Sequence, residues 1–529
     1  MINPALFKNK WALAGMFVCC LLLIFEIFFI LNQPWMGDYW EHKAVIHEIA
    51  VHPFQPSHPI INAHLPHAFY SPYLVGLGMI VYYTGISVNQ VLNAAIIINL
   101  FLFFFAVWIL VKLFLKKEEP AWKAFTLLLL AILFFNGWDM PNFSSFFHFR
   151  TFLLILSYPS TVSFLFSIFA AALFQFCINT REKRSKRILA ALLAVLLLWV
   201  ALLAHPVTYL LAGALFIVVL IQKQQEAEFF FNPSFFYNGF IAAVLLLLPF
   251  AFAFVWPYYP FYSLITYVSP GNQFHADSRE LYSNLYFKLY PFLILLFIVR
   301  KNFLEYTKAN FSIIAALIFL SFFFVYGFIS GSYGFGRVIS FITILATVFL
   351  LQYILLTYSF KKQTAILLTM FLICTPFIYA SFISNFILAG TSHQQYLSAP
   401  IRVPYQNTPP AEKVHRTMFL QNYLHQNDIV MADSNVTALL PSIGAKVMGS
   451  FYPAYWIADN KERIAAIKQF YSAFTTAEQR SVIIKKYGVH YIVLNPANDG
   501  LLPVLQPLID SSFRVSQNGI TLLQVKKNL

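Results

Sequence analysis

Residues 88 to 114 read VNQVLNAAIIINLFLFFFAVWILVKLF, and this stretch decides the class of fold. It carries no charged side chain before Lys112, and it is longer than the roughly 20 apolar residues that a helix needs to cross a bilayer. Similar runs extend from Trp11 to Leu31 and from Ile188 to Ala204. Because backbone polar groups in lipid must be satisfied within their own segment, these runs predict membrane-spanning helices.

The composition of the whole chain agrees with this interpretation. Its 529 residues are 59% hydrophobic and 11% charged, with a mean hydropathy of +0.68, whereas a soluble domain carries about 25% charged residues. The net charge is +14, but binding of nucleic acid requires basic residues clustered on one accessible face. We therefore expect the lipid bilayer as a partner and no nucleic acid. The four cysteines lie inside apolar runs and indicate neither a disulfide framework nor a metal site.

The hydrophobic pattern predicts eleven spans, and the positive charges orient them. Of the 22 Lys and Arg residues before residue 400, 17 fall on alternate connections that share the side of the N-terminus. The positive-inside rule makes that side cytoplasmic, and an odd number of spans places the C-terminus on the opposite side. The predicted spans are 11–31, 88–114, 121–138, 151–178, 188–204, 206–222, 235–255, 287–300, 311–330, 338–358 and 363–387.

The amino-acid composition of the chain changes after the last predicted span. Residues 391–411 contain Pro400, Pro404, Pro409 and Pro410 and are expected to form a stiff linker. Residues 1–390 then form the transmembrane module, including an outer loop at 32–87. Residues 412–529 form a soluble α/β domain. Its pattern predicts helices over 412–426 and 459–487 and strands over 429–432, 491–494 and 521–525.

The first outer loop begins with a charged segment, Gly37-Asp38-Tyr39-Trp40-Glu41-His42. Its apolar spacing predicts an amphipathic helix that lies along the membrane surface. Asp38, Glu41 and His42 are spaced i, i+3 and i+4, so they share one helix face. A partly buried carboxylate at this position is a candidate general base for an acceptor hydroxyl. The alternative is a set of solvated loop charges or a helix N-cap.

The same loop is rich in histidine, which raises the question of a metal. His47 and His52 are one residue too far apart for the zinc-protease pattern, because an i, i+5 pair diverges by about 140° on a helix. A divalent ion held by Asp38, Glu41 or a histidine is kept as an alternative. The histidines of this loop are His42, His47, His52, His58, His64 and His67.

A few cations are predicted on the outer side, where the orientation rule disfavours them. Arg337 follows the Gly-rich segment 330–336 at the start of a predicted span, so it is the first candidate for binding an anion. Arg150 and Arg279 rank behind it. His205 interrupts two apolar runs at the same boundary and is a further candidate. The alternatives are interfacial anchors, pairs with loop acids and, for His205, a satisfied turn histidine.

The order of these features resembles the GT-C superfamily of membrane glycosyltransferases. The resemblance rests on the basic N-terminus, the first span, the Asp38-containing loop, and the segment Tyr70-Ser71-Pro72-Tyr73 that opens a second amphipathic helix ending before Gly85. The C-terminal segments are similar to the outer domain of many bacterial members. Those segments are Ile429 to Asp433, Gly444 before a short strand, Glu478 to Arg480, and Lys485 to Val493.

The resemblance implies a GT-C-like fold and a function. It implies transfer of a sugar from a polyprenyl-phosphate donor to a glycan, lipid or protein acceptor, at the outer (periplasmic) face of a bacterial inner membrane. Asp38 matches the general base, but Tyr39 follows it where many members carry a second, adjacent acid, and the next acid in this sequence is Glu41. Asp139 is a weaker match to a possible second acid. Since the departing lipid phosphate gains negative charge, Arg337, Arg150, Arg279 and His205 are candidates for binding it.

Two other classes of function are weighed against this one. A multi-span transporter or flippase of a lipid-linked or small solute would also need several spans and a few outward charges, but broken helices or repeated halves are not evident. An O-antigen ligase or polymerase type of enzyme would share the donor, but its cations are expected in one large outer loop. The predicted loop at 256–286 contains a single cationic residue, Arg279.

Overall fold

The computed structural model describes most of the chain, and its contacts form two units. We call the described residues within 1–32, 95–255 and 268–389 the helical unit, and those within 33–94, 256–267 and 390–529 the sheet unit. The predicted linker at 391–411 lies outside the described residues. The described ranges are 9–32, 38–114, 121–141, 143–179, 182–225, 233–266, 278–300, 306–307, 310–389, 416–433, 436–437, 439–451 and 457–528.

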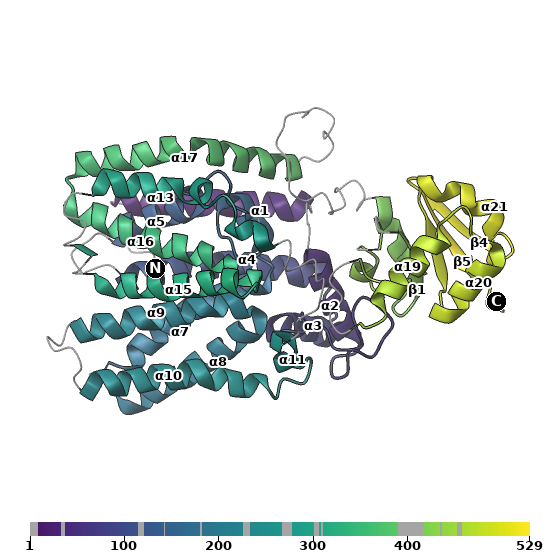
Figure 1. Cartoon of the computed structure of the whole chain (residues 1–529), viewed down its shortest axis with the longest axis horizontal. Coiled ribbons are helices and arrows are strands. Elements are labelled where there is room, and N and C mark those ends of the chain that lie inside the picture. The colour runs from purple at the N-terminus through teal and green to yellow at the C-terminus, as the bar shows by residue number, and fades with distance from the viewer. Residues whose placement is uncertain are drawn as a thin grey trace. The chain divides into compact units, whose positions relative to one another are not determined.

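The helical unit consists of long apolar helices that run side by side (Figure 1). Across the described ranges, ten helices are long and apolar enough to cross a membrane. The helices of this unit are α1 (Lys10–Asn32), most of α4 (Val88–Phe114), α5 (Ala121–Phe134), α6 (Phe149–Ile155), α7 (Pro159–Cys177), α8 (Arg184–Ala204), α9 (Pro206–Gln225), α10 (Pro233–Ala253), α13 (Leu285–Val299), α15 (Phe311–Ile329), α16 (Ile339–Thr357) and α17 (Phe360–Ala389).

Two of the predicted spans differ from the structure. The span predicted at 121–138 is the 14-residue helix α5, which is shorter than the other spans. The span predicted at 151–178 is divided into α6 and α7, and α7 begins at Pro159. Proline lacks an N–H group and is tolerated in the first turn of a helix but not in its interior, so it ends one helix and starts the next.

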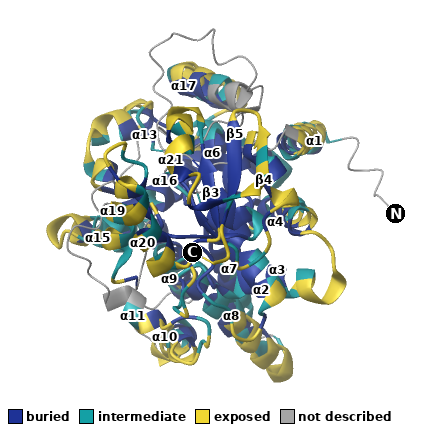
Figure 2. Cartoon of the chain, turned by 90° about the vertical axis from the view of Figure 1, so that its right-hand side faces the viewer, coloured by how far each residue is buried: buried dark blue, intermediate teal, exposed yellow. Residues whose placement is uncertain are grey.

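The outward surface of the helical unit is apolar, as expected in lipid. Much of α8 and α10 is exposed (Figure 2), with large side chains such as Leu192 and Phe240 at 64% and 68% exposure. Water would not favour such a surface, whereas lipid chains do. The predicted fold class, a polytopic helical membrane protein with a C-terminal α/β domain, is therefore confirmed.

The sheet unit is built on a five-stranded sheet with the strand order β2-β1-β3-β5-β4. The first three of these are parallel, and β5 runs antiparallel to β3 and β4. Strand β4 was not predicted. It reaches β5 through Asn518 and Gly519, both with positive φ, which is typical of a tight hairpin turn. The strands are β1 (Ile429–Met431), β2 (Lys446–Val447), β3 (Tyr491–Leu494), β4 (Ile509–Gln517) and β5 (Ile520–Val525).

The predicted helices of the C-terminal domain are only partly confirmed. The helix predicted at 459–487 is two helices, α19 (Asn460–Phe470) and α20 (Ala477–Tyr487). Thr476 starts the second one, because its side chain and that of Gln479 form a reciprocal capping box. The helix predicted at 412–426 is confirmed only in part: of its described residues, 416–417 are α-helical and Met418–Asn422 form the 3-10 helix η5.

Both faces of the sheet are covered by apolar side chains. Ile492 and Leu494 of β3 share one core with Ile467 and Phe470 of α19. On the opposite face, the core that contains Tyr491 and Val493 also contains Ile60 and Ile61, which come from the first predicted outer loop. Strand β3 is consequently buried along its length, in contrast to the edge strand β4 (Figure 2).

The first predicted outer loop contains two helices, α2 (Tyr39–Val51) and α3 (Pro72–Thr84). Both were predicted, and α3 is shorter than a full span. The helices approach closely at Gly78, where a Cβ atom would lie 2.5 Å from Ile49. The prediction that α2 lies along the membrane surface as an amphipathic helix is wrong. From Tyr39 to Ile49, both its polar and its apolar residues are buried, and the helix packs against α3 and the short helix η6 (Leu440–Ile443).

Candidate functional site

Arg337 lies in the short 3-10 helix η3 (Tyr333–Val338), which joins α15 to α16. The residue is only 7% exposed. Its Nη1 atom donates to Ser144 Oγ at 2.9 Å and lies 3.1 Å from His205 Nε2. The guanidinium also lies 5.2 Å from the centre of the Phe143 ring, a favourable cation–π distance. Three helix junctions that are distant in sequence therefore orient this side chain.

The protonation of His205 follows from its two neighbours. A guanidinium can only donate hydrogen bonds, so the contact with Arg337 requires an unprotonated Nε2. Nδ1 lies 2.7 Å from Thr208 Oγ1 and accepts a hydrogen bond from the Thr208 backbone N–H at 3.2 Å, so the two ring nitrogens cannot both carry a proton. Burial, together with the positive charge of Arg337, lowers the pKa of His205 to about 3. The imidazole is consequently neutral.

Further hydrogen bonds fix the segments that surround Arg337. Ser163 Oγ donates to the His205 carbonyl at 3.3 Å, and Ser340 Oγ donates to the Ser145 carbonyl at 2.7 Å. The hydroxyl of Ser160 donates to the carbonyl of Ser144. These bonds tie the loop before α6 to α7 and α16. The surroundings of the guanidinium are thus rigid, which is what a preorganised anion site requires.

The other candidate cations are placed differently from Arg337. Arg279 is exposed on the 3-10 helix η2 (Ser278–Tyr282). That helix packs against η3, since a Cβ atom at Gly336 would lie 2.7 Å from Leu281. Arg150 is half-buried on α6. The structure therefore joins Arg337 and His205 directly, whereas Arg279 belongs to a neighbouring segment.

Asp139, the predicted second acid, lies beside a buried lysine. Its carboxylate is 3.4 Å from Lys288 Nζ, and the side chains are 42% and 2% exposed. Lys288 also donates to the Glu280 carbonyl at 3.1 Å and to the Ser283 carbonyl. The Asp139 segment comes close to α13 at Gly137, where a Cβ atom would be 2.2 Å from the Lys288 carbonyl. The catalytic role of Asp139 stays a prediction.

In the sheet unit, Asp38 and Glu41 stand at the beginning of α2 with different burial. Asp38 is the N-cap residue and is partly exposed, whereas Glu41 is 7% exposed. Burial, and then the nearby charge of Asp38, raise the pKa of Glu41 well above its usual value. Glu41 is therefore a neutral acid, and Asp38 is the carboxyl that a substrate can reach from solvent.

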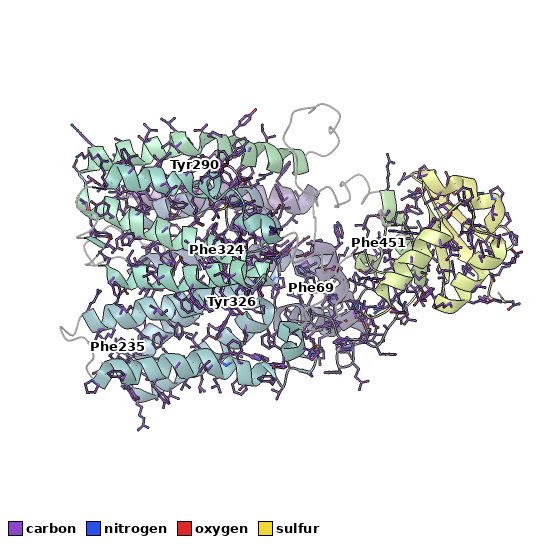
Figure 3. All side chains as sticks on the ribbon, in the orientation of Figure 1. Phe69, Phe235, Tyr290, Phe324, Tyr326 and Phe451 are labelled. Atoms are coloured by element: carbon purple, nitrogen blue, oxygen red, sulfur yellow. The ribbon has the colours of Figure 1, made fainter. Side chains whose placement is uncertain are left out.

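Three histidines of the first loop, His42, His58 and His67, form a buried aromatic group. The His42 ring lies 5.1 Å from the ring of Phe69, which is labelled in Figure 3. The His67 ring lies 4.7 Å from that of His58. Burial lowers the pKa values of His42 and His67 to about 3, with a smaller contribution from a neighbouring charge. All three rings are thus neutral parts of the packing around α2.

These side chains do not form a cluster with enough metal-binding groups at short distances. Nowhere in the described ranges do three or more His, Cys, Asp or Glu side chains lie close enough together to hold a metal ion. The divalent ion at Asp38, Glu41 or a histidine stays a prediction.

Several residues of these two sites had no signal in the sequence. Ser144 is one serine among many, and its contact with Arg337 spans 193 positions. Glu48 and Lys446 form a buried ion pair across 398 positions. A spacing rule links residues within one element only, so such contacts require the tertiary structure.

Comparisons with known proteins give a distant likeness. No family model matches the chain, and no curated protein matches its sequence. The oligosaccharyltransferase of Archaeoglobus fulgidus in its apo form is 13% identical, with a TM-score of 0.49, over 97% of this chain and 75% of that one. The same enzyme tethered to an acceptor peptide with the NVT sequon is 13% identical, with a TM-score of 0.47, over 99% and 75%.

A third structure, the archaeal oligosaccharyltransferase AglB from Archaeoglobus fulgidus with an inhibitory peptide and a dolichol-phosphate, is 14% identical. Its TM-score is 0.43 over 93% of this chain and 70% of that one. At TM-scores below 0.5 a shared fold is not established.

Proposed function

We propose that this protein is a membrane glycosyltransferase. It transfers a sugar from a polyprenyl-phosphate donor to an acceptor at the outer face of the membrane, with Asp38 as general base. The glycosyl donor leaves its lipid phosphate with added negative charge, and the acceptor hydroxyl loses a proton. The reaction therefore needs a fixed cation and an accessible carboxylate.

The observation that carries this proposal is the difference between Asp38 and Glu41. Burial keeps Glu41 neutral, while Asp38 stands at the accessible end of the same helix. A pair of neighbouring carboxyls in unequal environments is the arrangement by which enzymes assign acid and base roles. Asp38 takes the proton from the acceptor, and the neutral Glu41 supports the helix end beside it.

Arg337 supplies the charge that the leaving phosphate needs. Its guanidinium is held by a hydroxyl and a neutral imidazole, so these two partners orient it without neutralising it. A guanidinium can bind two oxygens of a phosphate at once. A transporter or flippase would also use a cation of this kind, but it has no need for a general base.

The proposal is tested by replacing Asp38. We expect Asp38→Asn to lower sugar transfer by about 10²-fold or more, because an amide cannot accept the acceptor proton. The assay uses purified protein, a synthetic polyprenyl-phosphate sugar and a hydroxyl acceptor. Asp499→Asn, at an exposed acid of the sheet unit, is the matched control and should keep normal turnover. Normal transfer by Asp38→Asn would remove Asp38 from the mechanism, and lipid movement without sugar transfer would indicate a flippase.

The outer location of the C-terminal domain is tested by labelling. Phe474 is 96% exposed, so Phe474→Cys in a variant without the four native cysteines provides an accessible thiol. We expect an impermeant maleimide to label it in intact spheroplasts, because the basic connections mark the other side as cytoplasmic. Labelling only after lysis would invert the topology and exclude an outer active site.

A further inference from the structure

A fully buried ion pair joins α2 to the C-terminal sheet within the sheet unit. Lys446 Nζ lies 2.5 Å from Glu48 Oε2, and the two side chains are 3% and 1% exposed. Lys446 Nζ also donates to the His58 carbonyl at 2.7 Å. Ser57 donates to Glu48 Oε1 through its backbone N–H at 2.8 Å and its hydroxyl at 2.7 Å. The pair is therefore well satisfied by the residues around it.

Apolar and backbone contacts accompany the pair. The backbone N–H of Val447 donates to the Ile60 carbonyl at 2.8 Å, and Ile61 forms a parallel bridge with Val447. Ile60 and Ile61 are buried in the same core as Val430 and Val493. The first loop thus extends the sheet beyond the edge strand β2 and covers one of its faces.

A buried pair of this kind is poorly explained by stability alone. Burial opposes ionisation of Glu48, but Lys446 and the hydrogen bonds from Ser57 hold its pKa below the ordinary value. Removing two charges from water is costly, and two apolar side chains of similar size would often serve stability as well. What a charge pair adds is register, because each group can be satisfied only opposite its partner.

The register matters because α2 carries the candidate base. Asp38 and Glu48 stand at opposite ends of this helix, about 15 Å apart at 1.5 Å per residue. A helix that slid or rotated by one residue would move Asp38 by more than a catalytic contact tolerates. Lys446 is the charged group of the C-terminal sheet that contacts this helix near its far end, beside Gln426, whose amide lies 3.5 Å from Glu48 Oε2.

We propose that the Glu48–Lys446 pair is a positioning device, by which the C-terminal domain sets the place of Asp38. The proposal rests on the function proposed above as far as turnover is concerned. It assigns the C-terminal domain an indirect part in the chemical step, through the position of α2. Glu48 and Lys446 touch no substrate and act through α2.

The test compares single, double and control variants of the full-length protein. We expect Glu48→Gln and Lys446→Met each to increase hydrogen exchange in α2 and residues 57–61, and to lower kcat about tenfold or more, with little change in the KM for the donor. The double variant Glu48→Gln/Lys446→Met contains no lone buried charge, so it should regain expression and thermal stability. Its kcat should nevertheless stay low, because the register contact is absent.

The exposed pair Glu462–Lys486, at 59% and 53% exposure, provides the matched control. Glu462→Gln/Lys486→Met should leave exchange and kcat unchanged. A double Glu48/Lys446 variant with normal kcat would show that the pair serves folding only, and unchanged exchange in α2 of the single variants would also overturn the proposal. Since exchange is measured without substrate, it decides the coupling even if the wild-type protein transfers no sugar.

Discussion

Two buried cations, Arg337 in the helical unit and Lys446 in the sheet unit, are held in contrasting ways. Lys446 meets the carboxylate of Glu48 at 2.5 Å. Arg337 contacts the hydroxyl of Ser144 and the neutral imidazole of His205. Both side chains are almost fully buried and both are oriented by distant segments of the chain. The difference lies in the charge of the partners.

That difference separates a structural cation from a candidate functional one. A carboxylate cancels the charge of a lysine, and the resulting pair fixes the position of the elements that carry it. A hydroxyl and a neutral imidazole restrict a guanidinium without themselves cancelling its charge. Burial alone does not reveal the role of a cation, whereas the chemistry of its contacts does.

The largest effect expected from this comparison concerns Arg337. Arg337→Ala should lower kcat by about 10²- to 10³-fold and weaken donor affinity, because the charge on the leaving phosphate grows in the transition state. Arg337→Lys should retain part of both, since an ammonium is a point charge without the two-pronged geometry. Both constants are measured with the synthetic polyprenyl-phosphate sugar.

The exposed Arg279 is the control for that experiment. Arg279→Ala removes a positive charge from the segment next to Arg337, so an equal loss in both alanine variants would point to general electrostatic attraction. Near-normal kinetics of Arg337→Ala, with a reduced protein yield, would make Arg337 an interfacial anchor. Either result would end the distinction between the two buried cations.

A smaller effect is expected from a change of pH. Each cation lies near a buried histidine, whose pKa is lowered mainly by burial and further by the positive charge of the cation. The pKa of His205 beside Arg337 and that of His67 near Lys446 are both lowered from 6.5 to about 3. As the pH falls, such a histidine is therefore protonated near pH 6.5 in the unfolded chain, but only near pH 3 in the folded chain. For the fully buried His67, folding should lose up to about 1.4 kcal/mol per pH unit across that window as the pH falls.

Thermal unfolding in detergent at several pH values between roughly 5 and 8 measures this slope. His67→Gln should make the slope shallower. When the donor kinetics are plotted against pH, the wild-type protein and His205→Gln should have profiles of the same shape. His205 is neutral throughout that range and therefore adds no inflection. An inflection near the ordinary histidine pKa that disappears in His205→Gln would mean that His205 is protonated beside Arg337, contrary to the neutral state inferred from its burial.

The sequence by itself determined the class of fold and most of the spans. Ten of the eleven predicted spans correspond to long apolar helices, since the requirement to satisfy the backbone within one segment is local and leaves a readable run of apolar residues. Predictions failed where a single local feature intervened, as when Pro159 divided one span into α6 and α7. The N-terminal ends of α2 and α3 could be predicted from the sequence, because the start of a helix depends on residues that are neighbours in the chain.

Only the tertiary structure decided how the candidate site is assembled. The sequence singled out Arg337 and His205 separately, but their 3.1 Å contact and the part of Ser144 depend on three helix junctions meeting. Likewise, no pattern relates Glu48 to Lys446, or Ile61 to the edge of a sheet that begins more than 350 positions later. Periodicity describes the faces of one element at a time, whereas burial and charge pairing depend on which faces the folded chain brings together.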